Sequence, residues 1–131
     1  MRRNPGRTVL IVEPDADARS ALRALLEDDG YTVVATGAAD DAMSVIGNPK
    51  IRLVVTELYL GNGTSRCLLS AISGPLRGRR PNVLAYTRHG RAKDRAWAIA
   101  AGADGYVLKR NGEARLLEVV GRLSRARAHH D

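Results

Sequence analysis

Residues 8–13 read Thr-Val-Leu-Ile-Val-Glu, a continuous apolar run that ends in a carboxylate. A continuous run of β-branched and aliphatic residues, in place of an alternating one, is typical of a strand buried on both faces of a sheet. Asp15 follows and can cap a helix, whose apolar positions recur at spacings of three and four: Ala18, Ala21, Leu22, Leu25 and Leu26. The beginning of the chain therefore predicts a buried strand followed at once by an amphipathic helix.

The same order of strand and helix recurs along the rest of the 131 residues. Further runs rich in β-branched and aliphatic residues predict strands at 31–35, 51–56, 82–86 and 105–108. The intervening segments predict helices at 38–46, 65–73 and 91–101, and a last helix with Leu116, Val119, Val120 and Leu123 on one face. Strands that alternate with helices of this length pair in parallel through right-handed crossovers. We therefore predict an α/β fold of the (βα)5 type, a doubly wound five-stranded parallel sheet. It spans residues 8–124, between a basic extension at 1–7 and a basic tail at 125–131.

The composition excludes several classes of protein. Apolar residues make up 44% and charged residues 27%, as in a soluble globular domain. No apolar run reaches the ~18–20 residues of a membrane span, so we expect a cytoplasmic protein without a membrane partner. Cys67 is the single cysteine, which excludes an internal disulfide and a thiolate metal cluster, and we expect it to be a small buried residue.

The charge balance has two interpretations. The net charge of +7 and the pI near 10.3 would suit nucleic acid or an acidic protein surface. The same arginines could equally form a solvated surface. Because no known DNA-reading motif accompanies the charge, we favour the solvated surface and do not expect nucleic acid as the partner.

A doubly wound sheet binds ligands at the carboxyl ends of its strands, near the point where the strand order reverses. That rule selects four short segments: Glu-Pro-Asp at 13–15, Glu-Leu-Tyr at 57–59, Thr-Arg-His at 87–89 and Lys-Arg at 109–110. Together they place carboxylates, a hydroxyl and an ammonium around one cleft. This set suits phosphoryl chemistry, in which a carboxylate accepts the group, neighbouring carboxylates hold Mg²⁺, and Thr and Lys bind the phosphoryl oxygens.

With these segments the sequence resembles the receiver domains of bacterial response regulators, the CheY-like superfamily of two-component signal transduction. The resemblance runs from about Thr8 to Leu123 and is carried by Val-Leu-Ile-Val-Glu at 9–13 and Ala-Gly-Ala-Asp-Gly-Tyr-Val-Leu-Lys at 101–109. It implies the flavodoxin-like receiver fold and a role in a phosphorelay. It also implies that Thr87 and Lys109 hold phosphate-binding positions. Tyr106 matches the aromatic that switches rotamer on activation, although it could also simply pack half-buried with its hydroxyl in water.

The chain departs from the family pattern at the residues that carry the chemistry. In the family, two acidic residues after the first strand hold Mg²⁺; Glu13 matches the first, Pro14 stands at the second, and Asp15 comes one residue late. Glu57 stands where the family has its phospho-accepting Asp. We therefore expect a degenerate magnesium site at Glu13, Pro14 and Glu57 and no cofactor; Mg²⁺ is expected only if the standard receiver chemistry survives.

Two arginines mark further departures. Arg88 follows the Thr, where the family usually has a small residue. Arg110 follows the Lys, where the family usually has Pro after a cis peptide bond. A cis bond before any other residue costs ~2.5–4 kcal/mol, so we predict a trans bond between Lys109 and Arg110 and a different loop course.

Three functions compete. The first is a phospho-receiver charged on Glu57 by a histidine kinase, although an extra methylene moves the nucleophile by ~1 Å, which can cost ~10²-fold in rate. The second, which we prefer, is a phosphorylation-independent interaction module in which Glu57 partly mimics an aspartyl phosphate. Lys109, with Arg88 as a possible second cation, would then pair with the ionised Glu57. The third is a basic nucleic-acid-binding domain. We do not expect an enzyme, because the sequence offers no nucleophile–base pair and no cofactor fingerprint.

The expected partner is another protein: a histidine kinase, a second regulator or an output protein. The resemblance implies docking or homodimer formation through the fourth helix, fifth strand and fifth helix. We expect that face to carry Arg91, Arg95, Trp97 and Tyr106. A basic face with an aromatic anchor suits an acidic partner, and the same residues could equally form a plain solvated surface.

Overall fold

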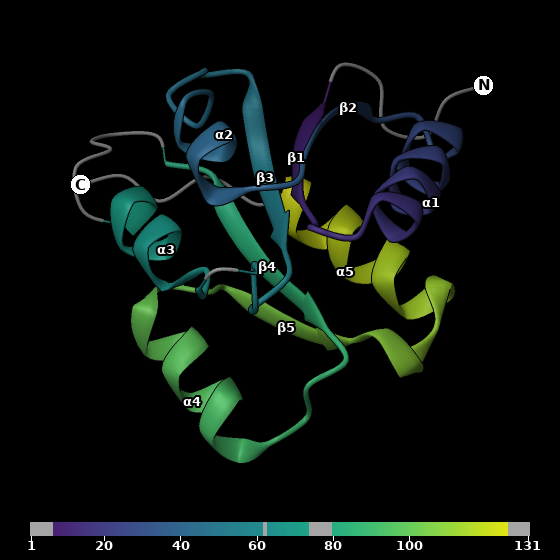
Figure 1. Ribbon diagram of the computed structural model, residues 1–131. Helices are drawn as coiled ribbons and strands as arrows, with labels where there is room; N and C mark the ends of the chain where they lie inside the picture. Colours follow the sequence, from purple (N-terminus) through teal and green to yellow (C-terminus); the bar gives the residue numbers. More distant parts are fainter. Residues whose placement is uncertain (1–6, 62, 74–79, 126–131) are drawn as a thin grey trace.

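The computed structural model describes residues 7–61, 63–73 and 80–125. The elements alternate along the chain (Figure 1). The strands are β1 (Thr8–Val12), β2 (Thr32–Thr36), β3 (Ile51–Thr56), β4 (Asn82–Thr87) and β5 (Gly105–Leu108). The helices are α1 (Ala16–Asp28), α2 (Ala39–Met43), α3 (Arg66–Ser73), α4 (Ala92–Ala101) and α5 (Glu113–Arg125), with a 3₁₀ turn at Lys109–Asn111. The basic extension and tail predicted from the sequence lie, except for Arg7 and Arg125, outside the described residues.

The five strands form one parallel sheet in the order β2-β1-β3-β4-β5. This confirms the predicted doubly wound, flavodoxin-like fold. From β1 the chain passes first to β2, on one side of β1, and then to β3, on the opposite side of β1. The strand order therefore reverses between β1 and β3. Val12 pairs with Thr56 at this reversal, and the residues that follow them, Glu13 and Glu57, therefore lie side by side at the carboxyl edge.

Successive residues of each strand point to opposite faces of the sheet and so enter separate buried cores. In β1, Val9 and Ile11 pack with α1 and α5, whereas Leu10 and Val12 pack with α2 and α3. Figure 1 shows the same two layers of helices around the sheet. Because both faces are covered, the strands read as continuous apolar runs in the sequence.

The structure corrects two expectations drawn from the sequence. The second helix ends at Met43, short of the predicted 38–46, because the chain tightens into turns in which Val45 and Asn48 donate to carbonyls only three residues back. Cys67 is exposed, not buried, because the core-facing positions of α3 belong to Leu68, Leu69 and Ile72. No helix in the described part of the chain is long and apolar enough to cross a membrane.

Candidate functional site

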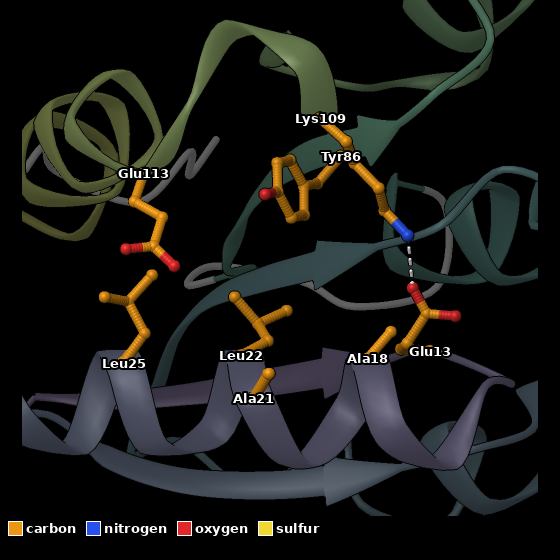
Figure 2. Close-up of a pocket in the computed structure, with 8 residues that line it drawn as sticks. All are labelled: Glu13, Ala18, Ala21, Leu22, Leu25, Tyr86, Lys109 and Glu113. Atoms are coloured by element: carbon orange, nitrogen blue, oxygen red, sulfur yellow. Dashed lines mark hydrogen bonds and ion pairs between the residues drawn. The ribbon is translucent and has the colours of Figure 1, made fainter.

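Three charged side chains from three strand ends meet at the carboxyl edge of the sheet. The Lys109 ammonium lies 2.6 Å from Oε1 of Glu13 and 3.4 Å from Oε1 of Glu57. Both glutamates are buried, with 6% and 7% of their surface exposed. Figure 2 shows the Lys109 side chain extended toward Glu13. The sequence predicted that these residues would converge, and the structure brings all three together.

Each carboxylate divides its two oxygens between the ammonium and the backbone. Oε2 of Glu13 accepts a hydrogen bond of 3.0 Å from the Asp15 N–H. Oε2 of Glu57 accepts one of 2.5 Å from the Leu58 N–H. These bonds fix both carboxylates in the orientation that faces Lys109.

The environment of Lys109 favours its charged form. Burial alone lowers the pKa of the ammonium. The hydrogen bond to Glu13 and the negative charges of Glu13 and Glu57 outweigh that effect, so the pKa lies above its ordinary value of 10.5. One ammonium between two carboxylates leaves the cluster with a formal charge of −1.

A cavity of about 450 Å³ opens above this cluster. Its wall is formed by Glu13, Pro14, Asp15, Ala18, Glu57, Tyr59, Arg88, His89 and Lys109. Asp15 caps α1, since its Oδ2 accepts a bond of 2.8 Å from the Ala18 N–H, as the sequence predicted. Arg88 is on the wall, but within the described ranges no ion pair joins it to Glu13 or Glu57. Its predicted role as a second cation therefore stays a prediction.

The other two predicted site residues, Thr87 and Tyr106, form hydrogen bonds with the loop after β4. Thr87 is fully buried, and its hydroxyl accepts a bond of 3.2 Å from the His89 N–H. The Tyr106 hydroxyl donates a bond of 2.5 Å to the His89 carbonyl, so it is not simply in water. Burial, with the charges of Asp94 and Glu57, raises the pKa of Tyr106. Thr87 and Tyr106 thus hold His89 in the cavity wall from two sides.

The Lys109–Arg110 peptide bond is trans, as predicted. The chain then enters the 3₁₀ turn Lys109–Asn111, in which the Asn111 side chain accepts a bond of 3.2 Å from the Leu108 N–H. The turn carries the Arg110 guanidinium to within 3.3 Å of the point where a Cβ on Gly90 would stand. Arg110 therefore lies against the loop between β4 and α4.

Sequence reasoning missed a polar network beside the cavity. Asp94, the third residue of α4, is 1% exposed and accepts hydrogen bonds from three side chains. The Tyr59 hydroxyl donates to Oδ1, Arg91 Nε donates to Oδ2 at 2.8 Å, and Trp97 Nε1 donates to Oδ1 at 3.4 Å. The bond from Tyr59 is the main cause that lowers the pKa of Asp94, against the opposing effect of burial. An acidic residue in a helix otherwise rich in Ala was the one available signal.

Tyr59 connects this network to the cavity. Its ring lies in the wall, edge-on to the ring of His89 with the centroids 4.5 Å apart. Its hydroxyl reaches Asp94, so one side chain contacts both the mouth of the cavity and the first turn of α4. The loop that carries Tyr59 closes through a hydrogen bond of 2.8 Å from Leu60 N–H to the Gly63 carbonyl, and Gly61 takes a positive φ of 80° there.

The predicted docking face needs one correction. Trp97 packs against two clusters of buried side chains, one under α3 and one at β4, and the Arg66 guanidinium lies 4.9 Å from its ring. Trp97 therefore lies toward α3. Arg91 is engaged by Asp94. Arg95 lies over the Tyr106 ring at 5.6 Å, and Ile99, one helical turn further on the same side of α4, is 47% exposed. The residues that α4 presents beside β5 are therefore Arg95 and Ile99.

Few side chains at this site could coordinate the Mg²⁺ that the family resemblance implies. Pro14 offers no side-chain oxygen, and Asp15 is turned to the α1 N-terminus. Within the described ranges, no group of three or more His, Cys, Asp or Glu side chains could hold a metal ion.

Comparison with known proteins identifies the family. The model of the response regulator receiver domain matches residues 9–121, and the chain belongs to this family. It is 31% identical to the two-component response regulator PprB of Pseudomonas aeruginosa, over 88% of this chain but 43% of PprB. The chain thus spans less than half of that relative.

Solved structures agree with the fold. The BeF₃-activated receiver domain of RstA from Klebsiella pneumoniae matches with a TM-score of 0.82 at 23% identity, covering 92% of this chain and all of that domain. The receiver domain dimer of NtrC4, also activated by beryllofluoride, matches with a TM-score of 0.76 at 23% identity, over 88% of this chain and 94% of its own. The protein is therefore a receiver domain of two-component signal transduction.

Proposed function

We propose that this receiver acts as a protein-interaction module whose state does not depend on phosphorylation, with Glu57 at the phospho-acceptor position. One observation carries the proposal: Lys109 makes ion pairs with both Glu13 and Glu57. In this arrangement the protein supplies its own cation to the two acidic strand ends.

The side chain of Glu57 supports this reading. It is one methylene longer than Asp and carries a negative charge, so it partly imitates an aspartyl phosphate. Its Oε1 is 3.4 Å from the ammonium, within ion-pair distance. Arg88, on the wall of the same cavity, can supply a second positive charge.

We further propose that the domain works without Mg²⁺ and is not an enzyme. Mg²⁺ requires close to octahedral coordination by oxygens at ~2.0–2.1 Å. Here the oxygens of Glu13 and Glu57 are engaged by Lys109 and by backbone N–H groups. A metal ion would have to displace the ammonium and would find no ligand on Pro14.

A second candidate is a working phospho-receiver charged on Glu57 by a histidine kinase. The observation in its favour is that Glu57 lines a cavity of about 450 Å³, large enough for a small phosphodonor. The two candidates differ in one measurable quantity, the mass of the protein after exposure to a phosphodonor.

The test is incubation of the full chain with acetyl phosphate and Mg²⁺, followed by intact-mass measurement. We expect no gain in mass. A gain of one phosphoryl group in the wild-type protein that is lost in Glu57→Gln would establish Glu57 as an acceptor and reject the phosphorylation-independent module.

We propose that the partner is a protein, either a kinase, regulator or output protein or a second copy of the chain, which docks on the face formed by α4, β5 and α5. Arg95 and Ile99 support this face: an exposed aliphatic side chain beside a cation suits a partner with an apolar contact and an acidic rim. The NtrC4 receiver, which has the same fold, is described as a dimer.

A further inference from the structure

A second cavity lies on the other side of Lys109, between α1 and the first residue of α5 (Figure 2). We propose that this cavity binds a small organic cation, an ammonium group on a short aromatic or aliphatic body, with the ammonium held by Glu113 and Tyr86. The proposal does not depend on whether Glu57 is phosphorylated.

The floor of the cavity is apolar. α1 contributes Ala18, Ala21, Leu22 and Leu25, and β4 contributes the ring of Tyr86. Figure 2 shows these α1 side chains directed toward the ring and the Lys109 stem. A floor of this kind stabilises an apolar body by removing it from water, with no hydrogen bonds to satisfy.

One end of the cavity carries two polar groups with no protein partner. Figure 2 shows the Tyr86 hydroxyl directed toward the end of the cavity where Glu113 lies. Within the described residues, no hydrogen bond or ion pair engages either the hydroxyl of the half-buried Tyr86 or the carboxylate of Glu113, which is exposed. The negative charge of Glu113 also contributes to the raised pKa of Tyr86, after burial as the first cause and against the charge of Lys109. A carboxylate and a hydroxyl oxygen at one end of an apolar cavity form an acceptor pair for an ammonium.

The opposite end selects against an anion. Lys109 is the one cation among the described residues that line the wall, and its ammonium is paired at 2.6 Å with Glu13, which lines the same cavity. An anionic ligand would have to break that ion pair and approach Glu113. A cation meets an available carboxylate and leaves the Lys109–Glu13 pair in place.

The volume sets the size of the ligand. The cavity measures about 180 Å³. An engineered apolar cavity of about 150 Å³ in another protein holds benzene, so one ring or a chain of roughly six carbons fits here. Benzylamine combines such a ring with one ammonium and serves as the probe.

The experiment titrates the ¹⁵N-labelled full chain with benzylamine, benzyl alcohol and benzoate and follows the amide shifts. We expect saturable shifts confined to α1 and the start of α5. We also expect benzylamine to bind roughly tenfold more tightly than the alcohol, as one charge-assisted hydrogen bond provides. Glu113→Gln should remove that difference, whereas Glu118→Gln, an exposed glutamate on the same helix outside the cavity, should keep it.

A second pair of variants tests the cavity itself. Ala21→Leu places a larger side chain in the wall and should weaken benzylamine binding at least tenfold, whereas Ala24→Leu, exposed on α1 outside the cavity, should not. Absence of a saturable shift, equal affinity for amine and alcohol, or unchanged affinity in Ala21→Leu would each overturn the proposal.

Discussion

Lys109 and Glu13 form the shorter of the two ion pairs at the site, 2.6 Å between ammonium and carboxylate across 96 positions of sequence. The sequence suggested that Lys109 serves mainly as counter-ion to Glu57. The structure makes Glu13 its nearer partner and Glu57 the second, at 3.4 Å. The role of Lys109 is therefore to hold two carboxylates beside each other, which alone would repel.

Lys109→Met tests that role. The variant leaves two buried carboxylates facing each other without a cation, and we expect the free energy of unfolding at pH 7 to fall by about 1–3 kcal/mol. Urea denaturation measures this. Lys50→Met, at an exposed lysine, is the control and should change the stability by less than about 0.5 kcal/mol.

The difference in stability between the wild type and Lys109→Met should also depend on pH, in a direction that follows from the pKa of Lys109. Because the folded-state pKa of Lys109 is raised above 10.5, its contribution is fully present below that pH. The contribution is lost as the pH rises through the folded-state pKa. The difference between the wild type and Lys109→Met should stay constant from pH 7 to about 10 and then narrow. A difference that grows above pH 10 would contradict this assignment.

Restoring the family's acidic residues tests the proposed loss of metal chemistry. We expect Glu57→Asp alone to remain unphosphorylated by acetyl phosphate, because Pro14 still denies the metal a ligand. Glu57→Asp with Pro14→Asp should gain one phosphoryl group in a Mg²⁺-dependent manner, measured by intact mass. Millimolar Mg²⁺ should shift the amide signals around position 57 in the double variant and leave the wild type unchanged. Phosphorylation of the single variant would show that Pro14 is not the obstacle.

The bond between Tyr59 and Asp94 is accessible to a double-mutant cycle. Tyr59→Phe removes one donor, whereas Asp94→Asn removes the charge that three donors share, so the second should destabilise more. The double variant should lose less stability than the sum of the two, because the residues are in direct contact. Because the pKa of Asp94 is lowered, its contribution to the free energy of unfolding is present above pH 3.8. That contribution is lost as the pH falls through the folded-state pKa. Additive losses in urea denaturation would mean that this bond is energetically silent.

The docking face is tested by self-association. Ile99→Asp places a charge on the exposed aliphatic position of α4, and we expect the dimer dissociation constant to rise at least tenfold, since a buried Ile contributes ~1.5–3 kcal/mol. Sedimentation equilibrium measures it. Met43→Asp, at the other large hydrophobic residue that is exposed within the described ranges, is on α2 and should leave self-association unchanged. Equal effects of both variants would place the interface elsewhere.

The sequence was informative where backbone geometry decides the outcome. Continuous apolar runs predicted the strands, and parallel pairing then required Glu13, Glu57 and Lys109 to meet at one edge. The capping role of Asp15 followed from its position before α1.

It was uninformative where side-chain direction decides. Tyr59 and Asp94 are 35 positions apart, and only the packed loop brings them together. The exposure of Cys67 depended on which face of α3 turns to the core, and the order of the two partners of Lys109 depended on rotamers. A single sequence does not show which way a side chain points or which rotamer it adopts.

Tyr59 connects two surfaces of the domain through a single side chain. Its ring forms part of the cavity wall and its hydroxyl is bonded to Asp94 of α4, so displacement of the ring would also break that hydrogen bond. If a molecule entering the cavity favours one position of Tyr59, a partner on α4 that favours the same position must bind more tightly by the same factor. Tyr59→Phe would preserve both surfaces but remove the hydrogen bond to Asp94. In that variant the cavity ligand and the partner on α4 would no longer change each other's affinity through this bond.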